Sequence, residues 1–206
     1  MIKKLLLSSF VLAVASFGCQ PATENIDIIN DAGKPVMGLD YRDFDRAASE
    51  MVQSMVASGA FKKEGGGRYV VAKGRITNDT MQRIDTDQLM AKVEQELTRS
   101  GLVAMTAAVG AGVEPRDSLV HSVREVRDSD HADEFNQDTL QAKGQLIAPE
   151  LSISGKIIQR NVRYDNDKQQ VEYYFQLRMT NLTTGLTFWQ NEIVLGKRGS
   201  NKSVSW

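Results

Sequence analysis

The sequence predicts a single α+β domain in which a mixed β-sheet is flanked by helices. From residue 40 to residue 147, stretches with helical hydrophobic periodicity alternate with short apolar strands. The last third changes period, because apolar and polar residues alternate strictly from Val171 to Thr180 and turns separate three consecutive strands. An αβαβα half followed by three antiparallel strands fits one sheet with helices packed on it.

The first predicted helix begins at Asp40, which can cap it, and ends just before Gly59. Its apolar residues recur at spacings of three and four, as expected for one buried face: Phe44, Ala47, Ala48, Met51, Val52 and Met55. A flexible loop at Gly65–Gly67 follows. Tyr69–Ala72 is nearly continuously apolar, which is typical of a strand that is covered on both faces.

The second predicted helix starts with a capping box, in which Asp85 is the cap and Gln88 reaches back to it. Gly101 is expected to end this helix. Its apolar face is expected to contain Leu89, Val93 and Leu97. The next strand is predicted at Leu102–Val109.

A third amphipathic segment follows Pro115 and Asp117. Its apolar face is predicted to contain Leu119, Val123 and Val126. The acidic stretch 128–138 is expected to be a polar connection. A further helix is predicted over Thr139–Ile147.

The C-terminal third is predicted to form three antiparallel strands. The first runs over Leu151–Tyr164, the second is the alternating segment, and the third covers Leu186–Leu195 after a turn at Thr184-Gly185. Trp189 is expected in the core, because large aromatic side chains usually fill a sheet face. The globular domain is predicted to span residues 40–197, and residues 198–206 to form a polar tail.

The N-terminus has the layout of a secretory signal peptide over residues 1–18. Met1–Lys4 is positively charged, Leu5–Phe17 is apolar, and Gly18 precedes Cys19, the single cysteine. The apolar run is too short to cross a bilayer about 30 Å thick. The layout resembles the bacterial lipobox, so Cys19 is expected to carry a lipid and residues 19–39 to form a short tether. The alternative is an ordinary secreted protein with one free thiol.

Charge and cysteine content narrow the possible functions. Without Lys3 and Lys4, 23 basic side chains remain against 26 acidic ones, which argues against a nucleic-acid-binding protein. No disulfide can form, because Cys19 has no partner, so the hydrophobic core alone must stabilise the domain.

The sequence contains no motif that indicates catalysis, a cofactor or a metal. His121 is expected on the solvated side of its helix, and His131 in a charged, solvent-exposed loop. The glycine run at 65–67 lacks the Lys-Ser/Thr ending of a phosphate-binding loop. Two carboxylates brought together by folding remain possible, since such a pair leaves no spacing in the sequence. The sequence therefore favours binding over catalysis.

Several stretches, taken in order behind the lipobox, resemble the LpoB family of outer-membrane lipoproteins, which activate bifunctional penicillin-binding proteins. The matching motifs are Asp40-Tyr41-x-x-Phe44 with Met51-Val52-x-Ser54-Met55, Ile76-x-Asn78-x-Thr80-x-x-x-Ile84-Asp85, and Thr184-Gly185-x-x-x-Trp189 followed by Lys197. They cover nearly all of residues 40–197.

The resemblance implies a fold similar to the N-terminal domain of the TolB protein. It implies a non-enzymatic activator, anchored on the periplasmic side of the outer membrane, that docks on a non-catalytic domain of a peptidoglycan synthase. Such an activator must favour the active conformation of the synthase over the resting one. The resemblance implies no cofactor, and the matched motifs consist of caps, turns and core positions.

Two other functions stay open at this point. One is an envelope assembly or secretion lipoprotein similar to the curli-export family, which would need membrane-inserting strands; Glu172 and Arg178 on the polar face of the alternating strand disfavour lipid contact. The other is a periplasmic hydrolase, which would need two carboxylates within about 5–10 Å of each other in a cleft.

Overall fold

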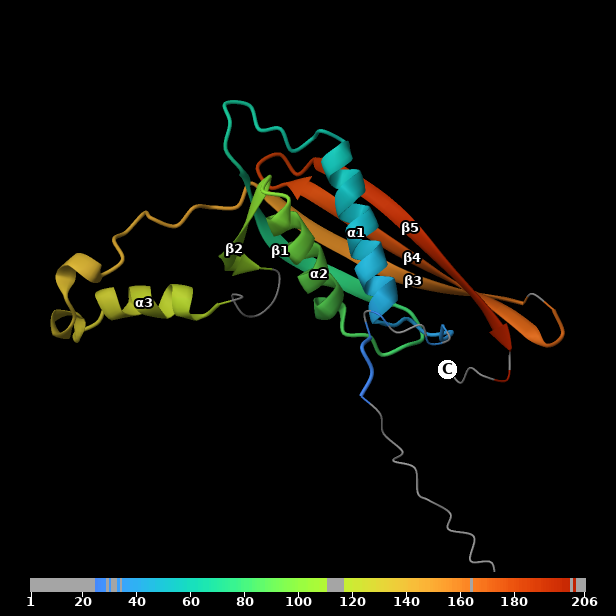
Figure 1. Ribbon diagram of the computed structural model, residues 1–206. Helices are drawn as coiled ribbons and strands as arrows, with labels where there is room; N and C mark the ends of the chain where they lie inside the picture. The colour runs from blue at the N-terminus through green and yellow to red at the C-terminus, as the bar shows by residue number, and fades with distance from the viewer. Residues whose placement is uncertain are drawn as a thin grey trace, which may run out of the picture. The chain divides into compact units, whose positions relative to one another are not determined.

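The computed structural model describes residues 25–28, 30, 33, 35–110, 117–163, 165–200 and 202. Contacts divide the chain into two units, residues 1–33 and 34–206. In the first, Asn30 closes a short turn through hydrogen bonds to the main chain and the side chain of Asp27. The second unit is an α+β domain, which confirms the predicted fold class. Figure 1 shows its helices and strands.

A five-stranded mixed sheet forms the centre of the domain, with the strand order β2-β1-β3-β4-β5. β1 (Tyr69–Asp79) pairs in parallel with both β2 (Val103–Gly110) and β3 (Leu151–Arg163). β4 (Lys168–Asn181) and β5 (Thr187–Ser200) continue the sheet as antiparallel strands. The predicted combination of a βα-connected half with three antiparallel strands is therefore confirmed.

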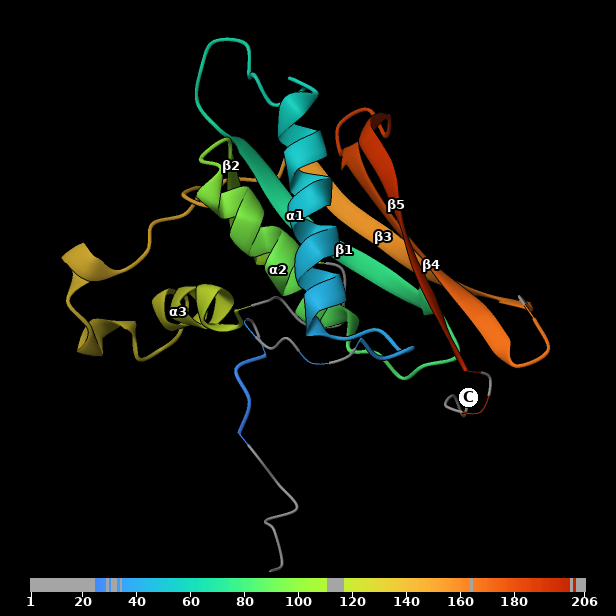
Figure 2. The same ribbon diagram turned by 45° about the vertical axis from the view of Figure 1, so that its right-hand side comes forward.

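Two helices, α1 (Tyr41–Ala57) and α2 (Thr86–Arg99), pack on the same face of the sheet (Figures 1 and 2). The α1 cap is a full capping box between Asp40 and Asp43, although the sequence had suggested only the first of these residues. The α2 cap is simpler than predicted: Asp85 accepts a hydrogen bond from the main chain of Asp87, and Gln88 forms no reciprocal bond. Gly59, just beyond α1, has a φ of 69°, as a helix-ending glycine often does.

The core lies between these helices and the sheet. All six predicted residues of α1 are buried, and so are Leu89, Val93 and Leu97 of α2. The odd-numbered residues of β4, from Val171 to Met179, complete the sheet side of the core. Phe44 of α1 meets Phe175 of β4 edge to face, with 6.2 Å between ring centroids. Trp189 is 9% exposed, which confirms its predicted place in the core.

Four expectations about the elements need correction. β1 is longer than predicted, because it continues past Ala72 to Asp79, where residues 76–79 pair with β3. β5 continues past Leu195 to Ser200, so the first residues of the expected polar tail belong to the sheet. The other two concern the connection between β2 and β3, residues 117–150, which we call the excursion.

Residues 117–150 leave the sheet after β2 and return at β3. α3 (Leu119–Arg127) forms where a helix was predicted, but none of its residues is buried. The helix predicted over Thr139–Ile147 is wrong: a 3-10 turn at Gln137–Thr139 ends there, and turns and irregular structure follow. Gly144 has a φ of 80°, which interrupts a right-handed helix, and Ile147 is 71% exposed, so no packing compensates.

Candidate functional site

The face of the sheet opposite α1 and α2 is polar and accessible over β3, β4 and β5. Because side chains alternate along a strand, the even-numbered residues of β4 point to this face. The strand register places Arg178 between Ser154 and Gln190, and Gln176 between Lys156 and Glu192. These six side chains are half-buried or exposed. We call this surface the open sheet face.

A shallow hollow of about 470 Å³ lies on the open sheet face. It is lined by the same six residues together with Gly155, Leu177 and Asn191. The Gln176 side-chain amide donates a hydrogen bond to the Glu192 carboxylate at 2.6 Å. Lys156 forms an ion pair with Asp79 of β1, also at 2.6 Å. The floor of the hollow is therefore an ordered array of polar groups.

The acidic side chains next to this hollow already have hydrogen-bond partners, whereas Arg178 has no acidic partner among the described residues. Glu172 accepts hydrogen bonds from the Tyr174 hydroxyl and from Gln170, both at 2.7 Å. The bond from Tyr174, reinforced by Gln170, lowers the pKa of Glu172, and the same bond raises the pKa of Tyr174. Arg160 lies over the Tyr174 ring.

Arg178 is exposed and has no acidic partner within the part of the chain that the structure describes. Its guanidinium is available to bind a carboxylate of another molecule.

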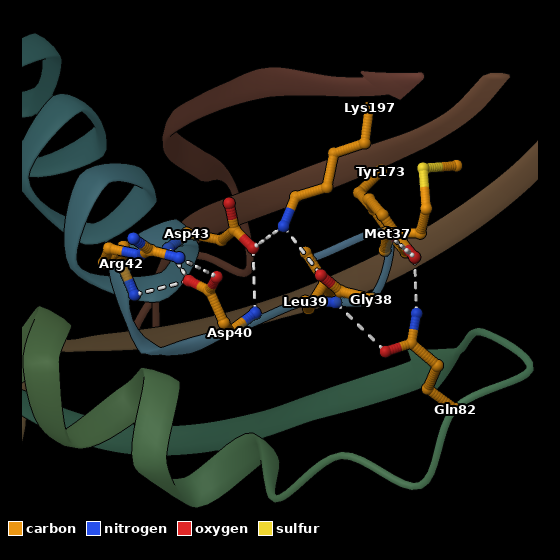
Figure 3. A network of polar contacts seen from close by, with 9 residues as sticks. All are labelled: Met37, Gly38, Leu39, Asp40, Arg42, Asp43, Gln82, Tyr173 and Lys197. Carbon is orange, nitrogen blue, oxygen red and sulfur yellow. Dashed lines mark hydrogen bonds and ion pairs between the residues drawn. The ribbon is translucent and has the colours of Figure 1, made fainter. Parts of the chain in front are cut away.

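A second polar cluster lies where the chain enters α1 (Figure 3). Lys197 of β5 forms an ion pair with Asp43 and donates a hydrogen bond to the carbonyl of Gly38 at 2.6 Å. Tyr173 of β4 donates its hydroxyl to the carbonyl of Met37 at 3.0 Å. Gln82 accepts from the main chain of Leu39 at 3.1 Å and donates to the Tyr173 hydroxyl.

The charges in this cluster favour the ionised form of the helix cap. Burial alone would raise the pKa of Asp40. The hydrogen bond from Arg42, the nearby charge of Lys197 and the main-chain donors of Asp43 and Arg42 outweigh it, so the pKa falls below its ordinary value. Tyr173 behaves in the opposite way, because burial raises its pKa to about 12. Asp40 is thus an anion and Tyr173 a neutral donor at neutral pH.

The cluster contains two residues from the motifs of the resemblance, Asp40 and Lys197. The ion pair within it joins residues far apart in the sequence, because 154 positions separate Lys197 from Asp43. Sequence reasoning missed the roles of Asp43, Gln82 and Tyr173. For Tyr173 a signal existed: a tyrosine on an otherwise apolar strand face needs a partner for its hydroxyl. For Lys197 the signal was its place after the third motif of the resemblance, which does not indicate that Asp43 is its partner.

The described residues include no group of three His, Cys, Asp or Glu side chains that could hold a metal ion. His131 lies in an exposed loop, 3.0 Å from Glu134, which confirms its predicted place. His121 is exposed as expected, yet its ring is not simply solvated, because Nε2 lies 2.8 Å from the Ala108 carbonyl oxygen. Asp40 and Asp43 lie close together, but both are engaged in capping α1 and in ion pairs.

Cys19, the predicted lipidation site, lies outside the described residues. Among the helices of the described part, none combines the length and the apolar character that crossing a membrane requires.

Comparison with known proteins identifies the family. The family model described as "Peptidoglycan-synthase activator LpoB" matches residues 43–194, which is more than half of the chain. No curated protein matches the chain.

Solved structures give distant likenesses. The LpoB C-terminal domain from Salmonella enterica has 12% identity and a TM-score of 0.40, over 74% of this chain and 98% of that one. The corresponding domain from Escherichia coli has 11% identity and a TM-score of 0.37, over the same shares of the two chains. A lipoprotein from Neisseria meningitidis has 10% identity and a TM-score of 0.37, over 66% of this chain and 87% of that one.

The family model and the extent of its match place the chain in a family. The match begins inside α1, covers α2, α3 and strands β1 to β4, and ends inside β5. The protein therefore belongs to the LpoB family.

Proposed function

We propose that this protein is an outer-membrane lipoprotein that binds a bifunctional penicillin-binding protein and stimulates its peptidoglycan synthesis. The observation that carries the proposal is the family match over residues 43–194. In this proposal Cys19 carries the lipid, residues 19–39 form the tether, and the domain reaches the synthase from the periplasmic side. The expected likeness to the TolB N-terminal domain belongs to the same proposal.

The chemistry of the described residues supports binding over catalysis. The open sheet face presents hydrogen-bonding groups over three strands. Arg178, which pairs with no acidic group among the described residues, favours a partner that contributes a carboxylate. We therefore assign the open sheet face as the docking surface, with an acidic patch on a non-catalytic domain of the synthase as its occupant. Binding there stimulates synthesis only if it is tighter to the active conformation of the enzyme.

The test is glycan-chain synthesis from lipid II by each bifunctional penicillin-binding protein of the organism, with and without the purified full-length protein. A saturable, several-fold increase in rate is expected for one of them. If no synthase responds and none binds in a pull-down, activation is wrong, and envelope assembly becomes the better hypothesis.

The docking surface has its own test with matched variants. Arg178→Glu should weaken binding to the responding synthase, because it replaces the unpaired cation with an anion. Arg68→Glu makes the same charge change at an exposed position in the loop before β1 and should leave binding unchanged. Equal binding by the two variants would remove the open sheet face from the proposal while leaving activation intact.

A further inference from the structure

The short segment before α1 is held by side chains from three distant parts of the domain. Each of its residues 37, 38 and 39 contributes one main-chain group: the Met37 carbonyl to Tyr173, the Gly38 carbonyl to Lys197, and the Leu39 amide to Gln82. Figure 3 shows these side chains converging on the segment from β4, β5 and the connection between β1 and α2. We call this arrangement the clasp.

The strongest part of the clasp is largely shielded from water. In the Lys197–Asp43 ion pair, the side chains are 11% and 16% exposed, respectively. Asp43 also accepts a hydrogen bond from the main chain of Asp40 at 2.8 Å, so the same carboxylate joins β5 to the first turn of α1. A shielded pair of this kind is sensitive to the loss of either partner, since the remaining charge would be left without its counter-charge.

The other contacts of the clasp hold Met37. The ring of Tyr173 is fully buried, and with its pKa near 12 the hydroxyl keeps the proton that it donates to Met37. The Met37 side chain lies so close to Gly199 of β5 that a Cβ added there would be 2.7 Å from its sulfur. Val36, directly before the clasp, is 53% exposed. Met37 is thus held through its main chain and through its side chain.

This geometry determines where a pull on the N-terminal segment would enter the domain. Without the clasp, tension would reach the first turn of α1 directly, and helix ends open at low free-energy cost. With the clasp, the same tension is shared among contacts to β4, β5 and the segment before α2. These contacts lie at three successive residues, so the tension reaches α1 only after they have broken.

We propose that the clasp transmits tension from the N-terminal segment to the sheet, and so keeps α1 docked while the domain is held at a partner. Its biological use depends on the proposed anchor at Cys19, because only a chain fixed at one end and bound at the other is stretched. The mechanical property depends on neither the anchor nor the synthase.

The experiment pulls single molecules of the full chain in its unlipidated form. Cys19, the only natural cysteine, is one attachment point, and Thr183→Cys in the turn before β5 is the other. At constant force, Lys197→Met should shorten the lifetime of the folded domain by about tenfold, because it removes the shielded counter-charge of Asp43. Lys92→Met is the matched control: Lys92 also pairs with an aspartate of α1, Asp45, but touches nothing in residues 37–39.

A second pulling direction separates tension transfer from simple stability. With Cys19→Ser, Glu64→Cys and Thr183→Cys, the force bypasses residues 37–39, and Lys197→Met should then shorten the lifetime no more than Lys92→Met does. Equal shortening in the two directions would overturn the proposal and reduce the clasp to an ordinary stabilising contact.

A milder variant guards against a Lys197→Met protein that does not fold. Tyr173→Phe removes only the hydroxyl that binds Met37 and Gln82. It should shorten the lifetime in the first direction by a smaller factor and leave the second direction unchanged. No difference between directions for this variant would also contradict tension transfer.

Discussion

α1 and α3 are both amphipathic helices, yet only one of them is buried. In α1, the six apolar residues from Phe44 to Met55 are at most 5% exposed. In α3, Leu119 is 65% exposed and Val123 is 42% exposed, and no residue of the helix is buried. Helical hydrophobic periodicity is therefore present in both helices, but the apolar face is buried in α1 and exposed in α3.

The difference lies in the surface that each helix meets. α1 packs against β4, β5 and α2, and its apolar face joins theirs in one core. α3 follows β2, the edge strand of the sheet, and is tied to it by polar contacts: the His121 ring to the Ala108 carbonyl, and the Asp117 amide to the Ala107 carbonyl. Periodicity specifies a helix with an apolar side, but burial needs a second apolar surface within reach.

The largest expected effect comes from truncating one apolar side chain in each helix. Met55→Ala should lower the free energy of unfolding by about 2–5 kcal/mol, because Met55 is fully buried and leaves a cavity. Leu119→Ala should change it by less than about 0.5 kcal/mol, as is usual for exposed positions. Urea denaturation of both variants measures the difference, and similar losses would show that α3 is packed after all.

Removal of the whole excursion sharpens the comparison further. If residues 118–147 are replaced by a Gly/Ser linker of equal length, the free energy of unfolding should fall by no more than about 2 kcal/mol, since few buried contacts are lost and closure entropy changes slowly with loop length. Chemical denaturation is the measurement. Failure of this variant to fold, while a linker replacing residues 62–67 is tolerated, would mean that the excursion supports the core.

The polar tie between α3 and β2 allows a finer test. His121→Ala should cost about 0.5–1.5 kcal/mol for the lost hydrogen bond to Ala108. The loss should be local, so amide exchange should accelerate in α3 and remain unchanged in α1. His131→Ala, in the exposed loop, is the control and should have no effect on either helix. Faster exchange in α1 as well would show that the two regions unfold together.

The smallest predicted effect concerns the cap of α1. The pKa of Asp40 is lower in the folded protein than in the unfolded chain, so its ionised form adds stability above the ordinary aspartate pKa. That stability is lost as the pH falls through the folded pKa. Asp40→Asn should therefore flatten the acid side of the stability curve, measured as unfolding free energy between about pH 2 and pH 6. A curve parallel to that of the unmodified protein would contradict the assigned pKa direction.

Local patterns predicted the elements best where the pattern was long. The alternation from Val171 to Thr180 correctly separated the buried and exposed faces of β4, because successive side chains of a strand must point to opposite sides. The helix expected at Thr139–Ile147 had a short and weak pattern, and Leu146 and Ile147 are 44% and 71% exposed, so packing does not stabilise it. The end of β5 was missed because Lys197–Ser200 is polar in sequence, although pairing with β4 and the contact of Lys197 with Asp43 hold it in the sheet.

The candidate site was less predictable than the fold. The alternation indicated that Glu172 and Arg178 share a polar face. It did not indicate that Gln170 and Tyr174 of the same strand engage Glu172, or that Arg178 has no acidic partner among the described residues. The family resemblance drew attention to Asp40 and Lys197 without indicating that they belong to one cluster. Their association depends on the position of β5 at the edge of the sheet, directly beside the start of α1.

By itself, the sequence determined the type of nearly every element, the buried faces of α1 and β4, and the resemblance to the LpoB family, because each of these depends on residues that are close together along the chain. Only the tertiary structure decided the strand order, the exposure of α3, the open sheet face and the clasp. These depend on contacts between distant residues, such as the pair formed by Asp43 and Lys197. Such contacts leave no periodicity or spacing in the sequence, because their partners lie far apart along the chain and meet only in the folded domain.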